Sequence, residues 1–185
     1  MQKTDLSLYD NAWFNPGGNA LKRWLWYIIN ALVFNSYFVP ISGPKRMILN
    51  MFGAKIAKGV VIKPKVNIKY PWHLHIGENT WIGEEVWIDC LTTVKIGANC
   101  CLSQGAMLLT GNHDYTKTAF DLMVKPIELE DGVWIGAKAV VCPGVICKTH
   151  SVLSVSSIAT KSLEPYTIYC GNPAGVVKSR NIVGS

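Results

Sequence analysis

An apolar residue recurs every six positions through much of this chain, and this period constrains the fold more than any other feature. The units place an aliphatic residue, or Cys or Ala, at position i, often glycine at i+1, and in most cases a small or β-branched residue at i+4. The residues at position i are Ile76, Ile82, Ile88, Ile96, Leu102, Leu108, Leu129, Ile135, Val141, Cys147, Leu153 and Ala159. A six-residue period is typical of a parallel β-helix, in which three units close one coil of about eighteen residues. We therefore predict an all-β protein built as a parallel β-helix.

The residue types in the repeat have physical reasons. Side chains at position i should point inward and stack on the next coil, which removes apolar surface from water at about 25 cal/mol per Å². Glycine at i+1 should suit a tight corner, because it tolerates backbone angles that other residues avoid. The steps from Ile68 to Ile76 and from Ile88 to Ile96 are eight residues long. Two coils should therefore carry two-residue insertions.

The repeat divides the chain into three parts. We expect an N-terminal tail with an apolar helical cap, a hexapeptide-repeat β-helix interrupted by one loop, and a C-terminal extension. The boundaries are residues 1–55 for the first part, 56–163 for the β-helix with its loop at about 113–128, and 164–185 for the extension.

The segment 21–34 differs from the repeats, because bulky apolar residues recur in it at helical spacing. A membrane-spanning helix needs about twenty apolar residues, and Asn30 interrupts this shorter stretch. Two compatible roles follow. The segment can cover the apolar end of the first coil, or it can make peripheral contact with a membrane, with Trp24, Trp26 and Tyr27 at headgroup level.

Composition narrows the class of partner and the compartment. The net charge is +6 and the isoelectric point about 9.0, but the basic residues are scattered and follow no nucleic-acid-binding pattern. An anionic small molecule or a membrane surface suits this charge better than nucleic acid. None of the six cysteines forms a Cys-x-x-Cys pair, which argues against a metal site or a disulfide framework. The polar start of the chain has no apolar signal segment, so we expect a cytoplasmic protein.

One histidine lies where the repeat loses its register. His113 stands in the segment 110–115, and the period resumes only at Leu129. Loops that leave a rigid scaffold often carry function. His113 is therefore the first candidate for a catalytic residue.

Several motifs together resemble the hexapeptide-repeat acyltransferases. They are Gly111-Asn-His-Asp-Tyr115, Gly132-Val-Trp-Ile-Gly-Ala137, Thr160-Lys161 and Gly171-Asn-Pro-Ala174. The runs Ile68-Lys-Tyr-Pro-Trp72, Trp87-Ile-Asp-Cys90 and Leu102-Ser-Gln-Gly-Ala106 make the chain similar to the O-acetyltransferases of polysaccharide biosynthesis, typified by the colanic acid acetyltransferases. The resemblance implies a left-handed β-helix, a homotrimer, and acetyl-coenzyme A bound in a groove between subunits. General rules favour right-handed crossovers, so the left hand rests on the resemblance.

The chemistry expected of such an enzyme assigns roles to a few residues. A sugar hydroxyl is a poor nucleophile until its proton is removed, and an imidazole, with a typical pKa of about 6.5, suits that task. We expect His113 to act as general base for direct attack on the thioester, without an acyl-enzyme. A cysteine nucleophile paired with His113 is a weaker alternative, because most cysteines fall inside the coil. The resemblance implies an oxyanion donor in the backbone N–H of Ala137 and an acceptor-binding role for Asp89.

The resemblance also marks positions for the coenzyme. It implies that Trp134 packs beside the pantetheine arm and that Lys178 faces the phosphates. Gly175 stands where relatives often carry a basic residue, and Arg180 is expected to compensate. The remaining positions implied to contact the coenzyme are Val155, Thr160 and Lys161.

We therefore expect an acetyl-coenzyme A-dependent O-acetyltransferase that needs no metal. The expected acceptor is a sugar hydroxyl of an exopolysaccharide or a lipid-linked oligosaccharide intermediate. One alternative is acetylation of a free sugar or an antibiotic, and another is a non-catalytic β-helix scaffold. The γ-class carbonic anhydrases share this type of solenoid, but they require a histidine where this chain has Thr118.

Overall fold

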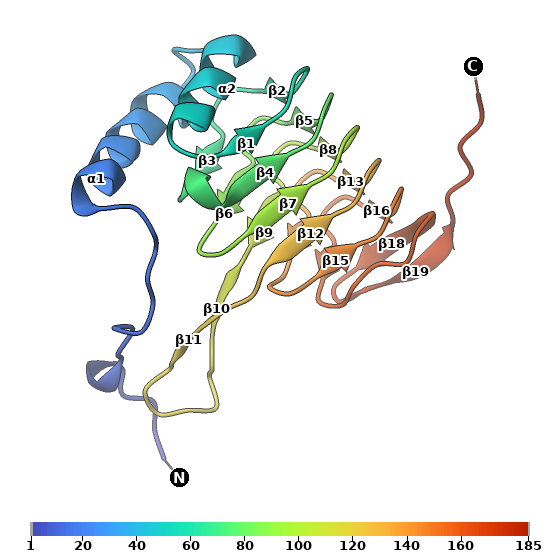
Figure 1. The fold of residues 1–185 in the computed structure, drawn as a ribbon. Coiled ribbons are helices and arrows are strands. Elements are labelled where there is room, and N and C mark those ends of the chain that lie inside the picture. The colour runs from blue at the N-terminus through green and yellow to red at the C-terminus, as the bar shows by residue number, and fades with distance from the viewer. Residues whose placement is uncertain (1, 185) are drawn as a thin grey trace.

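The structure, a computed structural model, describes residues 2–184. From Lys55 to Ala159 the chain winds as a parallel β-helix whose short strands stack into three walls (Figure 1). The first wall contains β1 (Lys55–Ile56), β4 (Leu74–Ile76), β7 (Val94–Ile96), β12 (Ile127–Leu129) and β15 (Ile146–Cys147). The second contains β2 (Val61–Ile62), β5 (Trp81–Ile82), β8 (Cys101–Leu102), β13 (Trp134–Ile135) and β16 (Val152–Leu153). The third contains β3 (Asn67–Ile68), β6 (Trp87–Asp89), β9 (Met107–Leu109), β14 (Val140–Val141) and β17 (Ile158–Ala159).

The hexapeptide register is confirmed. All twelve predicted inward positions are buried, and on the second wall Leu102 pairs in register with Ile82 on one side and Ile135 on the other. Position i+4 is buried in most units, for example at Thr80 and Ala106, but Asn112 is exposed. The two eight-residue steps accommodate a 3₁₀ turn, η3 (Pro71–His73), and the irregular segment 90–93.

The reason given above for glycine at i+1 is wrong. Gly77 and Gly136 do not have a positive φ, whereas residues with side chains, such as Asn79 and Lys138, occupy the left-handed corners. What excludes a side chain is the neighbouring coil. A Cβ on Gly77 would lie 2.5 Å from the backbone nitrogen of Ala98. Glycine is therefore required by close stacking of backbones.

Helices cover the first coil at one end of the solenoid (Figure 1). After a short 3₁₀ turn, η1 (Leu6–Leu8), come α1 (Ala20–Ile29), its π-helical continuation η2 (Asn30–Phe34), and α2 (Ser42–Met51). Asn19 caps α1 by accepting a hydrogen bond from the backbone N–H of Lys22 at 2.8 Å. No helix within residues 2–184 is long and apolar enough to cross a membrane.

The placement of Trp26 at a membrane interface is wrong. Its side chain is 2% exposed and packs against Phe34, with the ring centroids 5.2 Å apart. The indole N–H donates to the carbonyl of Ile68 at 2.8 Å, so this buried polar group is satisfied. Trp26 therefore ties α1 to the first coil.

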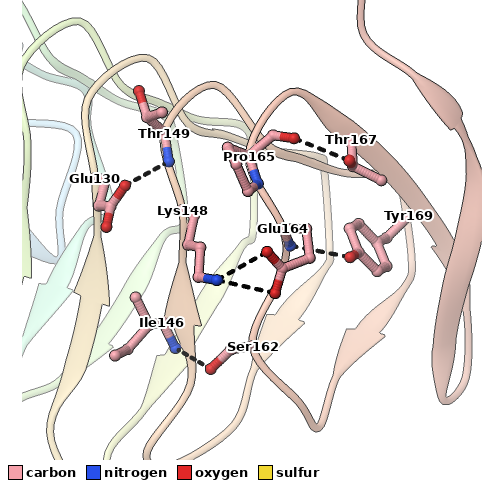
Figure 2. A network of polar contacts seen from close by, with 9 residues as sticks. All are labelled: Glu130, Ile146, Lys148, Thr149, Ser162, Glu164, Pro165, Thr167 and Tyr169. Carbon is pink, nitrogen blue, oxygen red and sulfur yellow. Dashed lines mark hydrogen bonds and ion pairs between the residues drawn. The ribbon is translucent and has the colours of Figure 1, made fainter.

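The opposite end is closed by an antiparallel hairpin of β18 (Thr167–Gly171) and β19 (Ala174–Ser179), which extends the second wall. Figure 2 shows the polar contacts that join the last coils. Lys148 contacts both carboxylate oxygens of Glu164 at 2.9 and 2.8 Å, and the backbone N–H of Glu164 donates to the hydroxyl of Tyr169 at 3.0 Å. Tyr169 is itself buried, so it helps to cover the apolar end of the coil.

Candidate active site

A β-hairpin interrupts the solenoid and carries His113. Its strands are β10 (Gly111–His113) and β11 (Leu122–Val124), which pair antiparallel, with His113 opposite Leu122. The hairpin leaves the coil between β9 and β12 and projects away from the walls (Figure 1). Near its tip Lys117 pairs with Asp121 at 2.9 Å. The predicted loop at about 113–128 is therefore an ordered hairpin for part of its length.

The hairpin holds the imidazole of His113 in one orientation. Its Nδ1 lies 2.8 Å from the carbonyl oxygen of Phe120, and the two rings stack with centroids 4.5 Å apart. A carbonyl oxygen can only accept, so Nδ1 carries the proton in this contact. The unprotonated nitrogen is then Nε2, and a histidine general base needs such an acceptor atom.

His113 and Asp89 line the same cavity, of about 430 Å³. Asp89 ends β6 and is nearly buried, and its Oδ1 lies 3.5 Å from the ammonium of Lys69. Within residues 2–184, that oxygen receives no hydrogen bond. A buried carboxylate oxygen with unused acceptor capacity can accept a hydrogen bond from a hydroxyl group of a ligand in the cavity.

Sequence reasoning missed other residues of this cavity. Lys69 and Tyr70 reach it from the eight-residue step of the coil, and the N-terminal tail adds Tyr9, Asn11 and Phe14. The segment Ile68–Trp72 is one of the motifs that carry the family resemblance, but nothing in the sequence indicated a role for the side chains of Lys69 and Tyr70. The tail gave no signal, because its approach depends on long-range contacts such as the one from the Asp5 N–H to the Thr118 carbonyl at 2.9 Å.

Three of the predicted coenzyme positions lie on or beside the second wall. Trp134 is on β13, 46% exposed, and its indole N–H donates to the hydroxyl of Ser103 at 2.9 Å. Ala137 and Val155 follow β13 and β16 at the same corner of adjacent coils, where the Ser156 N–H donates to the Ala137 carbonyl at 2.8 Å. The Ala137 N–H itself has no acceptor within residues 2–184, so it is free to bind one from a ligand.

The other predicted coenzyme positions are dispersed. Thr160 and Lys161 are exposed and follow β17, at the end of the third wall. Lys178 is exposed on β19. The guanidinium of Arg180 donates to the carbonyls of Gly132 and His150 at 2.9 and 3.1 Å, which gives this residue a contact within the fold; its role toward the coenzyme stays a prediction.

The single chain does not bring all these residues together. The cavity that contains His113 and Asp89 is not lined by Trp134 or Ala137. His113 belongs to the hairpin that follows the third wall, whereas Trp134 faces outward from the second. The predicted base and the predicted coenzyme site are therefore on separate faces of one chain.

Neither the buried cysteines nor a metal cluster offers an alternative centre. All six cysteines are free thiols. Burial raises the pKa of Cys100 to about 11 and also raises the pKa of Cys90 and Cys147, which disfavours the nucleophilic thiolate. Within residues 2–184, no group of three or more His, Cys, Asp or Glu side chains is arranged to hold a metal ion.

Comparison with known proteins decides the family. No protein-family model matches the chain. Over 164 residues it is 37% identical to the protein of Escherichia coli strain K12 that carries the name colanic acid biosynthesis acetyltransferase WcaF, covering 89% of this chain and 90% of that protein. The chain belongs to the hexapeptide-repeat acetyltransferases.

A further relative supports this membership, and a solved structure shows the same fold. The galactoside O-acetyltransferase of E. coli K12 is 31% identical over 139 residues, which cover 73% of this chain and 68% of that enzyme. Among solved structures, the hexapeptide-repeat acetyltransferase VCA0836 of Vibrio cholerae, complexed with acetyl-coenzyme A, has a TM-score of 0.77 at 21% identity and covers 88% of each chain. The predicted fold, a left-handed parallel β-helix, is confirmed for this hexapeptide-repeat acetyltransferase.

Proposed function

We propose that this protein transfers the acetyl group of acetyl-coenzyme A to a sugar hydroxyl of an exopolysaccharide or a lipid-linked oligosaccharide intermediate, in the cytoplasm. The observation that carries the proposal is the placement of His113 beside Asp89 in one cavity, with Nδ1 bound to a carbonyl and Nε2 available. The similarity to WcaF and to a galactoside O-acetyltransferase supports a carbohydrate acceptor. The acetyl-coenzyme A bound by VCA0836 supports the donor.

In the proposed mechanism, Nε2 of His113 takes the proton of the acceptor hydroxyl while its oxygen attacks the thioester carbonyl carbon. The free N–H of Ala137 donates to the oxyanion of the tetrahedral intermediate. Collapse of the intermediate breaks the carbon–sulfur bond, and the proton held by His113 passes to the sulfur of coenzyme A. The raised thiol pKa of Cys90, next to Asp89, supports direct transfer without an acyl-enzyme.

We propose that the working assembly is a homotrimer with the site between subunits. The support is geometric, because His113 and Trp134 lie on different faces of one chain. In such an assembly the hairpin of one subunit approaches the second wall of the next. This arrangement completes a site in which the base and the oxyanion donor can act on the same thioester.

The test is mass spectrometry of native oligosaccharide intermediates after incubation with the purified protein and acetyl-coenzyme A. We expect a mass gain of one acetyl group that depends on both the protein and the donor. Free sugars and an antibiotic are the comparison acceptors. A higher kcat/KM with either of these would contradict the proposed acceptor, and the absence of acetyl transfer to any of them would favour a non-catalytic scaffold.

Asp89→Asn should raise the acceptor KM by roughly tenfold or more, because a hydrogen bond to a charged group contributes about 1.5–3 kcal/mol. The acetyl-coenzyme A KM should stay within about twofold, because Trp134 and Lys178 belong to the sheet of the second wall, whereas Asp89 is on the third. Steady-state kinetics with each substrate varied in turn measures both values. An unchanged acceptor KM would remove Asp89 from the acceptor site.

Trp134→Ala and Lys178→Glu should each raise the apparent KM for acetyl-coenzyme A by roughly tenfold, the equivalent of about 1.4 kcal/mol of lost binding. The acceptor KM should change far less. Trp81→Ala is the matched control and should leave this KM unchanged. Trp81 is also exposed on the second wall, and Cys101 lies between it and Trp134, since Cys101 pairs with both. Calorimetry that finds wild-type affinity for coenzyme A in both variants would exclude these roles.

A further inference from the structure

The first helix carries more apolar residues than its contact with the β-helix uses. Its inner face packs on the β-helix through Trp26 and Ile29. A second stripe, at positions i, i+3, i+4, i+7 and i+11, comprises Leu21, Trp24, Leu25, Ile28 and Leu32, and all of these except the half-buried Ile28 are exposed. Leu21, Trp24 and Leu32 are 63%, 59% and 60% exposed. A helix that only covers a core needs one apolar face, so capping does not explain the second.

The exposed stripe continues into the following segment. Tyr37, Phe38 and Ile41 are exposed in the connection to α2, and Phe38 is 88% exposed. On α2 itself, Met47 and Met51 are exposed, while Leu49 is buried against the coil. We call these exposed residues of 21–51 the outer apolar face. Exposed apolar patches of this extent mark interaction sites for a protein or a membrane.

The part of the sequence that contains the outer apolar face carries charged residues of one sign. From residue 11 to residue 77 the chain has nine Lys or Arg residues and no Asp or Glu. The whole chain has 18 basic and 12 acidic residues, so the residues outside 11–77 include nine basic and 12 acidic ones and carry a net charge of −3. Three of these lysines pair with carboxylates of the next coil, at 3.5 to 3.8 Å, and Lys45 is buried. Within residues 2–184, Lys22, Arg23, Arg46, Lys55 and Lys63 have no carboxylate within 4.0 Å.

We infer that the outer apolar face lies in the interface of an anionic phospholipid bilayer. Trp, Tyr and Phe side chains beside cationic residues suit the headgroup boundary, and anionic lipids neutralise the cations. A second copy docked face to face fits less well, because a two-fold contact would bring the same cations together. The proposed trimer contact uses the hairpin and the second wall instead. Contact is peripheral, as no helix within residues 2–184 can span the bilayer.

This orientation connects the membrane to the acceptor site. The same helix forms one side of a cavity of about 540 Å³, lined by Arg23, Trp24, Tyr27 and Trp87 among others. That cavity shares Lys69 and Tyr70 with the cavity of His113. The two therefore adjoin, and docking through α1 places the acceptor site next to the bilayer. This last step rests on the proposed function, and it favours an acceptor that remains attached to a lipid.

Vesicle sedimentation tests the docking. The full chain should sediment with phosphatidylcholine vesicles that contain phosphatidylglycerol, less with phosphatidylcholine alone, and less again at high salt. The double variant Phe38→Ser with Met51→Ser should bind the anionic vesicles about tenfold more weakly or worse. The matched control is Ile182→Ser with Val183→Ser, which removes two exposed aliphatic residues from the C-terminal tail and should bind like wild type.

Three results would overturn the inference. The first is no binding of the wild-type chain to anionic vesicles at low salt, and the second is equal binding by the two double variants. The third is a change in the mass of the assembly in the Phe38→Ser, Met51→Ser variant but not in its control. The last result, seen by light scattering, would identify a second copy as the occupant. The His113→Ala variant should bind vesicles like wild type. Acetyl transfer to a soluble acceptor without vesicle binding would contradict the membrane docking alone. Vesicle binding without acetyl transfer would contradict only the proposed function.

Discussion

Replacing His113 with Ala should lower turnover by about 10²–10⁴-fold while the protein still folds and assembles. The side chain is half-buried at the end of β10, next to the loop of the hairpin and outside the stacked interior of the coil, so its removal leaves the solenoid intact. The loss should appear in kcat, because the proton is taken only in the transition state. Acetyl transfer, followed as release of free coenzyme A thiol, measures it.

The control is His75→Ala, which removes a half-buried histidine from β4 on the first wall, far along the chain from the hairpin. This variant should keep near-normal turnover. Near-normal turnover in His113→Ala would remove the residue from the mechanism.

Leu102→Ala should lower the free energy of unfolding by about 2–5 kcal/mol, the usual range for a fully buried leucine. Leu102 is completely buried between Ile82 and Ile135, in the middle of the stack on the second wall. Backbone hydrogen bonds fix the spacing of the coils on either side, so the cavity can collapse only in part. Urea denaturation at a fixed protein concentration gives the value, since stability of an oligomer depends on concentration.

Ile146→Ala on β15 is the comparison, because this side chain faces outward and is 40% exposed. Its removal leaves no enclosed cavity, so the loss should stay below about 1.5 kcal/mol. Equal losses from the two substitutions would contradict the assignment of inward and outward positions that underlies the whole repeat.

The candidate site was predictable in its parts but not in its assembly. The break in the repeat identified His113, and the family resemblance pointed to Asp89. Their meeting in one cavity depends on the hairpin, whose pairing of His113 with Leu122 links residues that no periodic pattern relates. The carbonyl of Phe120 that fixes the tautomer of His113 could not be foreseen either, because every residue offers a carbonyl and only the folded turn selects one.

The N-terminal segment shows the same division. Its composition predicted an apolar helix, and α1 follows that prediction. Three neighbouring aromatic residues looked equivalent in the sequence, yet Trp26 is buried while Trp24 and Tyr27 are exposed. A helix with more than one apolar face gives no signal for which of these faces meets the core. The hydrogen bond from the Trp26 indole to the carbonyl of Ile68 shows which face meets the core in the folded protein.

The sequence by itself determined the solenoid, since a strict six-residue period of apolar residues can be buried all at once only if identical coils stack in register. It determined the position of the catalytic candidate as well, because a break in such a period must leave the coil. The tertiary structure alone decided which backbones approach closely enough to require Gly77, and which residues of the distant tail and coil surround His113. These contacts join segments far apart in the chain, and their free energy depends on packing that no local pattern encodes.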